Sequence, residues 1–286
     1  MTNSHRILLL GGTGRVGQMV LHHWNFVLPS AVQVIEQHRD PARSTGIHWC
    51  LTKKPKETLD SFDIDAIVCL AGVTPGPNAD LLLNTPLAST VMREASRAGI
   101  KRVLLASSSA VYGAGDGTPF NESSPTNPIN EYGKAKLEME QSCAHWREEG
   151  LEVCCLRIGN VAGADALLLN VAGSTSNQPL HIDRFADGRG PVRSYIGPKT
   201  LAEVLYSLAT HKGQLPETLN IAAPKVVYME ELAHAANHPF DLCSAQEGSH
   251  QSITLDCDAL STFHAFDTDA SEATQMVAQW KEATSR

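Results

Sequence analysis

The sequence predicts an α/β protein in which helices cover both faces of a doubly wound parallel sheet, with a small discontinuous second domain. Short apolar runs of strand length alternate with longer helical stretches through the first half of the 286 residues. The runs are apolar at nearly every position, as expected for strands buried on both faces. A glycine-rich loop joins the first run to the first helical stretch. Right-handed crossovers between such strands produce a doubly wound sheet.

The first half contains most of the predicted sheet. The expected strands are 6–10, 32–37, 47–50, 66–70, 102–107 and 153–158. The expected helices between them are 16–26, 80–98 and 130–149. Strands that alternate with helices in this way indicate successive strand–helix–strand units, so residues 1–159 are predicted to form the first domain.

The pattern changes after Gly159, where residues 160–193 are rich in Gly, Asn, Ser and Asp and lack clean periodicity. Beyond it we expect a strand at 193–196, a helix at 198–210 that begins with a proline, a strand at 218–222, a helix at 229–237 and an amphipathic stretch at 269–283. Residues 193–222 are expected to complete the first domain. Segments 160–192 and 223–286 are expected to form the small lobe, which would bind a substrate.

Composition limits the possible partners. The net charge of −8 gives no reason to expect nucleic-acid binding. No apolar run approaches the roughly 18 residues of a membrane-spanning helix, so no membrane partner is expected. The first six residues lead directly into a short apolar run that is unlike a signal peptide, and we expect a cytoplasmic location.

Cysteine and histidine spacing does not indicate a metal site. The seven cysteines include no C-x-x-C motif and are expected to be reduced and structural. The twelve histidines are scattered, and the pair His22-His23 falls on a helical stretch without carboxylates nearby in the sequence. Solvated or packed histidines are therefore expected, and no metal ligands.

The loop after the first strand carries glycines at 11, 14 and 17, a relative of the G-x-G-x-x-G dinucleotide fingerprint. Gly11 would permit the tight turn, Gly14 would let the backbone approach a pyrophosphate, and Gly17 would allow close packing of helix on strand. The helix N-terminus would supply N–H donors to the phosphates. An isolated loop of this kind is often a plain turn, but the flanking strand and helix favour a dinucleotide site.

The end of the second strand indicates which dinucleotide binds. An acidic residue there accepts hydrogen bonds from the ribose hydroxyls of NAD, whereas an arginine accommodates the 2′-phosphate of NADP. Glu36 lies within the strand and His38 near its tip, so neither is a well-placed carboxylate. Arg39 and Arg15 could converge on a phosphate, and the alternative is that both are solvated. We expect NADP in preference to NAD.

Tyr132 and Lys136 are the residues most informative about chemistry. Residues four apart share one helix face, so the two side chains can point into one cleft. An ammonium group beside a phenol lowers the pKa of the phenol, which makes Tyr132 a candidate general acid/base. Upstream, the strand end reads Ala106-Ser107-Ser108-Ser109-Ala110 and supplies hydroxyls. Together with a dinucleotide loop, these groups indicate hydride transfer.

These motifs together resemble the extended, nucleotide-sugar epimerase/dehydratase branch of the short-chain dehydrogenase/reductase superfamily, whose core is a Rossmann-type sheet. The resemblance is carried by segments 11–17, 65–72, 99–103, 107–113, 132–136 and 157–163, and more weakly by 193–196 and 219–222. It covers about residues 6–163 well and implies a homodimer formed through helices 80–98 and 130–149.

The resemblance also implies roles for individual residues. The catalytic residues would be Ser108, Tyr132 and Lys136. The cofactor would be bound by Gly11, Thr13, Gly14, Arg15, Val16, Gly17, Arg39, Cys50, Leu51, Leu70, Ala71, Gly72, Ser107, Tyr132, Lys136 and Ile158. The small-molecule substrate would be bound by Ser108, Ser109, Asn160 and Arg193. For Ser108, a strand-end serine that caps the backbone is the alternative.

Two departures from the family pattern restrict the chemistry. Family dehydratases carry an Asp-Glu pair directly after the catalytic Ser/Thr, and this chain has Ser109-Ala110 there, which argues against dehydration and decarboxylation. The substrate motif keeps Arg193 but loses its His and final Asp. The expected function is therefore an NAD(P)-dependent oxidoreductase or epimerase that acts at a carbinol or carbonyl carbon. A nucleotide sugar is one candidate substrate class, and an NADPH-dependent reductase of a non-sugar aldehyde or ketone is the alternative. A non-catalytic NADP-binding redox sensor has less support.

Overall fold

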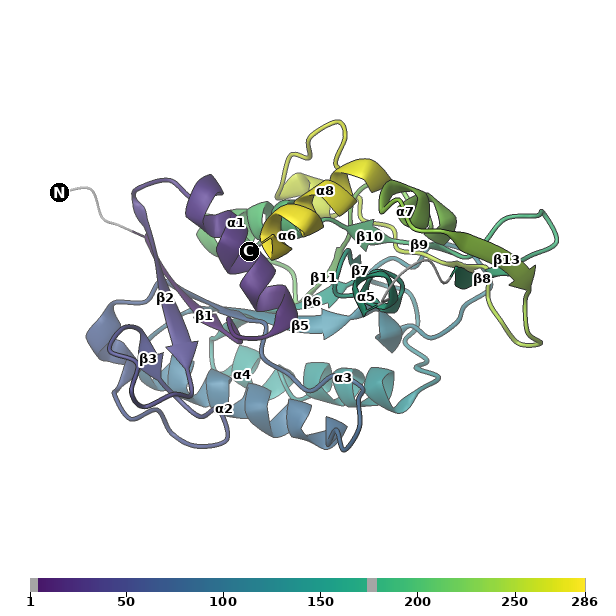
Figure 1. Cartoon of the computed structure of the whole chain (residues 1–286). Coiled ribbons are helices and arrows are strands. Elements are labelled where there is room, and N and C mark those ends of the chain that lie inside the picture. The colour runs from purple at the N-terminus through teal and green to yellow at the C-terminus, as the bar shows by residue number, and fades with distance from the viewer. Residues whose placement is uncertain (1–4, 174–178, 286) are drawn as a thin grey trace.

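A computed structural model describes residues 5–173 and 179–285 and contains a seven-stranded, fully parallel sheet (Figure 1). The strand order is β11-β6-β5-β4-β1-β2-β3, which confirms the predicted doubly wound arrangement. The strands are β1 (His5–Leu10), β2 (Val32–His38), β3 (Ile47–His48), β4 (Ala66–Cys69), β5 (Arg102–Ser108), β6 (Glu152–Ile158) and β11 (Thr218–Ile221). The order reverses direction between β1 and β4, and ligands of such sheets bind beyond the carboxyl ends of the strands at this point.

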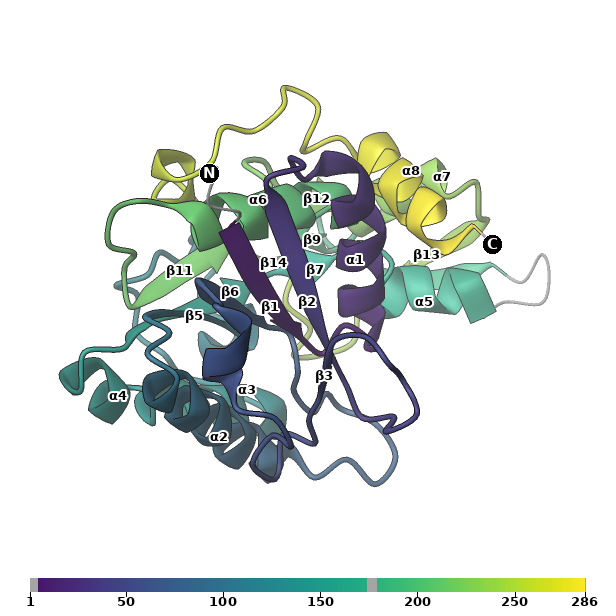
Figure 2. The same ribbon diagram turned by 90° about the vertical axis from the view of Figure 1, so that its left-hand side faces the viewer.

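Helices cover both faces of the sheet (Figures 1 and 2). One face carries α1 (Arg15–Val27), α6 (Pro198–Thr210) and α8 (Ala273–Thr284), and the other carries α2 (Asn84–Arg97), α3 (Glu131–Gln141) and α4 (Ala144–Glu148). Strand β1 shows why the residues from Ile7 to Leu10 are all apolar. Ile7 and Leu9 pack into one hydrophobic cluster, while Leu8 and Leu10 pack into the other.

A second group of smaller elements lies at the carboxyl end of the sheet (Figure 1). Strand β7 (Asn160–Val161) pairs with β10 (Tyr195–Ile196), and β9 (Val192–Arg193) lies between β12 (Val227–Tyr228) and β14 (Ser252–Ile253). Strand β8 (Leu180–Arg184) pairs with β13 (Phe240–Ser244), and the helices are α5 (Ala166–Gly173) and α7 (Met229–Ala235). Strand β11 belongs to the large sheet, and α8 packs on α1 and α6 as well as on α7. The predicted division into two domains remains a prediction.

Several elements differ from the sequence-based expectation. The helix expected at 80–98 begins at Asn84, after a 3₁₀ turn at Leu81–Leu83 that Asp80 caps. The helix expected at 130–149 is divided into α3 and α4 around residues 142–143. The single strand expected at 193–196 is instead two strands, β9 and β10, which belong to different sheets. They are separated at Ser194, whose hydroxyl accepts a hydrogen bond from Leu255 N and whose carbonyl accepts one from Asn160 N. Within residues 160–192, where no periodicity was visible, the structure contains β7, α5 and β8.

Among the described residues, no helix combines the length and apolar character that crossing a bilayer requires.

Candidate active site

The glycine loop gives α1 an open N-terminus. Gly11 has a φ of +84°, a conformation that favours glycine, and a Cβ at Gly17 would collide with the Gly11 carbonyl oxygen. Helix α1 begins at Arg15, and its N-cap residue, Gly14, provides no side-chain cap. The first turn of α1 also contains no acidic residue. The leading N–H groups and the positive end of the helix dipole can therefore bind an anionic group such as a pyrophosphate.

A cleft of about 620 Å³ extends from this loop along the carboxyl ends of the strands. Residues expected to bind cofactor or substrate line it together: Gly11, Gly14, Arg15, Val16, Gly17, Leu70, Gly72, Ser107, Ser108, Tyr132, Lys136, Ile158 and Asn160. The cleft is large enough for a dinucleotide portion and a small substrate. Its glycine cradle and uncapped helix end fit the diphosphate of NAD(P).

Lys136 is almost completely buried, with 4% of its surface exposed. Its Nζ donates to the Ala106 carbonyl at 2.9 Å and lies 5.9 Å from the centre of the Tyr132 ring. The position of the pair is set by α3, whose N-cap Asn130 accepts a hydrogen bond from Gly133 N at 2.8 Å. Burial lowers the pKa of Lys136 to about 8, and the nearby Glu140 carboxylate opposes this shift.

The structure corrects one expectation about Tyr132. The sequence predicted that Lys136 lowers the pKa of the phenol, but burial raises the pKa of Tyr132 above its usual value. The hydroxyl of Ser108 lowers it in part. The Lys136 ammonium donates to the Ala106 carbonyl, and its charge is not among the causes of the shift in the pKa of Tyr132. In the free protein Tyr132 is therefore a protonated acid at neutral pH.

The three adjacent serines have different surroundings. Ser108 ends β5 and lines the cleft, and its Oγ accepts a hydrogen bond from Ala110 N at 3.2 Å. Ser107 donates to Glu140 Oε1 at 2.5 Å in the interior. The backbone interpretation of Ser108 is confirmed, and its catalytic role stays a prediction, because a hydroxyl that accepts one backbone hydrogen bond can still donate its proton into the cleft.

A buried ion pair joins α3 to β6 and was not predicted from the sequence. Glu140 accepts hydrogen bonds from Arg157 at 2.8–3.2 Å, and both side chains are at most 8% exposed. Arg157 also donates to the Tyr112 hydroxyl at 2.9 Å, and Tyr112 donates to Asn220 at 2.7 Å. The spacing could have indicated it: Glu140 follows Lys136 by four residues, as Lys136 follows Tyr132, so all three lie on one face of the helix.

The end of β2 places a neutral amide beside the glycine loop. Gln37 accepts a hydrogen bond from Gly11 N at 3.3 Å and is 6% exposed. This is the region, about 20 residues after the loop, where an acidic residue would bind the ribose of NAD. Glu36 instead pairs with Arg43 at 3.0 Å and does not line the cleft. Sequence reasoning did not single out Gln37, although its spacing from the loop was a usable signal.

Other expected site residues do not line the cleft. These are Thr13, Arg39, Cys50, Leu51, Ala71, Ser109 and Arg193. The guanidinium of Arg193 donates to the backbone carbonyls of Val192, Gln251 and His250 at 2.6–3.0 Å, which uses three of its five N–H donors. Arg39 is exposed beyond β2, whereas Arg15 lines the cleft, so the two arginines are not brought together there.

The far end of the cleft is mostly apolar and carries one acid. Val161, Ala164, Ala166 and Leu169 line it beside Thr74, Pro75, Asn160 and Asp165. The Asp165 carboxylate accepts from the backbone N–H groups of Gly163, Leu167 and Leu168 at 3.0–3.2 Å, and burial raises its pKa. The sequence gives no signal for Asp165, because residues 160–193 lack clean periodicity.

A family model described as NAD dependent epimerase/dehydratase family matches residues 7–222, which include the loop, the cleft and α3. The chain belongs to this family. The UDP-glucose 4-epimerase of Azospirillum brasilense is 32% identical over 180 residues, 57% of this chain and 51% of that protein. The dTDP-6-deoxy-L-talose 4-dehydrogenase (NAD(P)(+)) of Kitasatospora kifunensis is 32% identical over 175 residues, 56% of this chain and 53% of that protein. The chain thus spans about half the length of the curated relatives it matches.

Solved structures share the fold along nearly the whole chain. The UDP-Glc/GlcNAc 4-epimerase of Campylobacter jejuni has a TM-score of 0.76 at 18% identity, covering 97% of this chain and 99% of that one. A short-chain dehydrogenase/reductase superfamily protein from Agrobacterium tumefaciens, solved with NAD, has a TM-score of 0.75 at 19% identity and covers 98% and 97%. These likenesses confirm the Rossmann-type fold of the extended short-chain dehydrogenases.

Family membership does not support the exclusion of dehydration. The family description includes dehydratases, and one similar structure is the NAD-dependent NDP-hexosamine 5,6-dehydratase TunA, with a TM-score of 0.74 at 20% identity. The argument against dehydration in this chain rests on Ser109-Ala110 alone.

Proposed function

We propose that this family member transfers hydride between NAD(P) and a carbinol or carbonyl carbon, with Tyr132 moving the proton at the substrate oxygen. The observation that supports this most directly is that Tyr132, Lys136 and Ser108 line the same cleft as the glycine loop. The groups come from α3, β5 and the turn before α1, which meet only in the folded protein.

Each side chain has a distinct role in this proposal. The nicotinamide of the cofactor, when bound, supplies the hydride or accepts it. The Tyr132 hydroxyl gives a proton to the substrate oxygen or takes one from it, and the Ser108 hydroxyl orients that oxygen. Lys136 keeps an ammonium group at the floor of the cleft, anchored on the Ala106 carbonyl. The burial of Tyr132 and Lys136 keeps water from the proton-transfer site.

The favoured reaction is epimerisation of a nucleotide sugar, in which a sugar carbinol is oxidised and the ketone is reduced from its other face. The names of the curated relatives support this reaction. The lack of a carboxyl group at 109–110 supports hydride chemistry without loss of water.

NADPH-dependent reduction of a smaller aldehyde or ketone is the second candidate, and three observations favour it. Burial raises the pKa of Tyr132, which suits a proton donor. The acceptor beside the loop is the neutral Gln37, which is compatible with a 2′-phosphate. Among the described residues, the far end of the cleft has no basic side chain to bind a diphosphate. Net consumption of NADPH would identify a reductase, whereas an epimerase interconverts sugars with no net change in nicotinamide absorbance.

Replacement of Tyr132 tests the proposal. Tyr132→Phe removes the proton donor and should lower kcat by about 10²–10⁴-fold, the usual contribution of general acid–base catalysis. Stabilisation by NADP(H) in thermal unfolding should persist, because the loop is untouched. Tyr206→Phe, on α6 and away from the cleft, is the matched control. Full activity of Tyr132→Phe would contradict the assignment, and wild-type protein that binds NADP without turning over any carbonyl or sugar substrate would indicate a redox sensor.

A further inference from the structure

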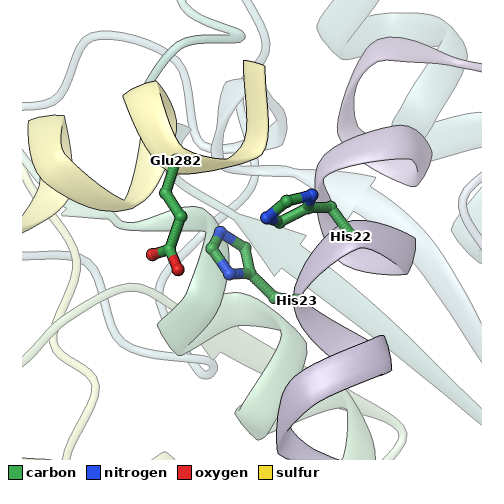
Figure 3. Close-up of side chains that lie close together, drawn as sticks. All are labelled: His22, His23 and Glu282. Atoms are coloured by element: carbon green, nitrogen blue, oxygen red, sulfur yellow. The ribbon is translucent and has the colours of Figure 1, made fainter. Parts of the chain in front are cut away.

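His22 and His23 on α1 and Glu282 on α8 form a cluster that has no part in the proposed active site (Figure 3). Each residue offers one possible ligand atom, and these atoms lie within 4.8 Å of one another. Figure 3 shows both imidazole rings and the carboxylate directed into the space between the two helices. In the sequence, Glu282 lies 259 positions after His23, which is why the pair was expected to lack a carboxylate partner.

The hydrogen bonding of His23 leaves a nitrogen lone pair available. Its Nε2 lies 3.0 Å from the Gln279 carbonyl, which can only accept, so Nε2 carries the proton and Nδ1 of the neutral ring has the lone pair. A backbone carbonyl bound to the opposite ring nitrogen is the usual second partner of a metal-binding histidine.

His22 provides the second, independent observation. Its Nε2 is buried and has no hydrogen-bond partner among the described residues. An unpaired buried nitrogen is costly unless a ligand binds it. Glu282 is exposed and has a flexible side chain, so its carboxylate can move toward the two rings. Lys199 is the cation that acts on His23 from α6, and it lies 3.7 Å from the carboxylate of Glu203, which offsets its charge.

We infer that His22, His23 and Glu282 bind a single Zn²⁺ ion that links α8 to α1. Two imidazoles and a carboxylate form a ligand set that suits Zn²⁺, with the fourth position open to water. Ligand atoms of a tetrahedral zinc site, at about 2.0–2.2 Å from the ion, are about 3.4 Å apart. Side-chain rotations that move the ligand atoms by about 1 Å would therefore bring them into tetrahedral positions around the ion. Because α1 begins at the glycine loop, the ion would hold in place the helix whose N-terminus faces the cleft.

Zinc titration of the chelator-treated, dialysed protein tests this inference. The background carries Cys50→Ser and Cys243→Ser, because both thiols are exposed and Cys243 lies 3.5 Å from His181, a second place where zinc could bind. Competition with a chromophoric chelator should show one equivalent of Zn²⁺, and zinc should raise the unfolding temperature whereas Mg²⁺ should not.

Variants then assign the ligands. His22→Gln and Glu282→Gln should each weaken zinc binding at least about ten-fold, and Glu282→Gln alters an exposed residue that folding does not require. His145→Gln on α4 and Glu272→Gln at the start of α8 are the matched controls and should bind zinc like the parent. Unchanged affinity in both cluster variants, or several weak equivalents in every protein, would mean an adventitious ion only and would overturn the inference. The readout does not use turnover, so its result is independent of the proposed reaction.

Discussion

At the residue scale, burial of the charged Lys136 ammonium lowers the stability of the folded protein. Its pKa of about 8 in the folded protein is below the usual 10.5, so the folded state disfavours the charged form. The resulting destabilisation is fully present below about pH 8 and disappears as the pH rises from about 8 to about 10.5. Destabilising buried charges of this kind are found mostly at functional sites, where the charge is needed for binding or catalysis.

Lys136→Met should therefore stabilise the protein while it abolishes the proposed activity. At pH 7 we expect a gain of at most about 3 kcal/mol in the free energy of unfolding, less the loss of the hydrogen bond to Ala106. Urea unfolding at pH 7, 8, 9 and 10 measures this. The gain should shrink as the pH increases, and a gain that is independent of pH would show that the pKa of Lys136 is the same in the folded and unfolded states.

Gln37 is the residue through which the proposed preference for NADP is tested. Gln37→Glu places a carboxylate beside the loop, where it would repel a 2′-phosphate and accept from ribose hydroxyls. The dissociation constant for NADP should increase at least about ten-fold relative to that for NAD, as expected for one unit of adverse charge at a buried position. Fluorescence titration with both nucleotides measures the ratio. Glu36→Gln is the control, and an unchanged ratio in Gln37→Glu would place the 2′-phosphate elsewhere.

At the element scale, α3 presents three functional side chains because Tyr132, Lys136 and Glu140 recur every four residues. Glu140 joins α3 to β6 through Arg157, and Ser107 joins it to β5. Gly133 lets α3 approach the turn after β5, because a Cβ there would collide with the Ala110 carbonyl. The orientation of Tyr132 therefore depends on contacts among two strands, one turn and one helix.

Removal of Glu140 should release α3 from the sheet. Glu140→Ala leaves the buried guanidinium of Arg157 unpaired, which should cost about 3–5 kcal/mol in denaturant unfolding. Glu131→Ala breaks the exposed pair of the same helix with Lys134 and should cost less than about 1 kcal/mol. The double variant Glu140→Met/Arg157→Met should recover most of the loss. Equal costs for the two single variants would show that the buried pair does not hold α3.

At the scale of the whole molecule, the resemblance predicted a homodimer through the helices now seen as α2 and α3–α4. Exposed apolar side chains lie just before α2 and α3: Leu82 is 70% exposed, Leu83 is 37% exposed and Ile129 is 63% exposed. Such side chains near one face are consistent with a contact between subunits.

Sedimentation velocity of Leu82→Asp tests the dimer. The wild type should sediment as a dimer at micromolar concentration, and the variant should shift toward monomer, because a buried unpaired carboxylate costs several kcal/mol. Phe26→Asp, on the exposed side of α1 with 74% of the side chain accessible, should leave the dimer intact. A monomeric wild type would refute the prediction.

Local signals in the sequence determined the parts of the fold that depend on neighbouring residues. Strand and helix alternation, the Gly11–Gly17 loop and the spacing of Tyr132 and Lys136 are set by short-range geometry, and the structure contains each of them. The helix at Pro198–Thr210 has the expected bounds, and proline at its first position explains where it begins.

Tertiary structure alone decided features whose partners are distant in the chain. Strands β8 and β13 have five residues each and are paired with each other, although they are distant in the chain. Arg193 became a backbone-binding residue because Gln251 and His250 fold against it. His22 and His23 acquired a carboxylate because α8 packs on α1. The local sequence pattern indicates the conformation of a segment, because that conformation depends on neighbouring residues. The chemistry of a site depends on which distant segments pack against each other.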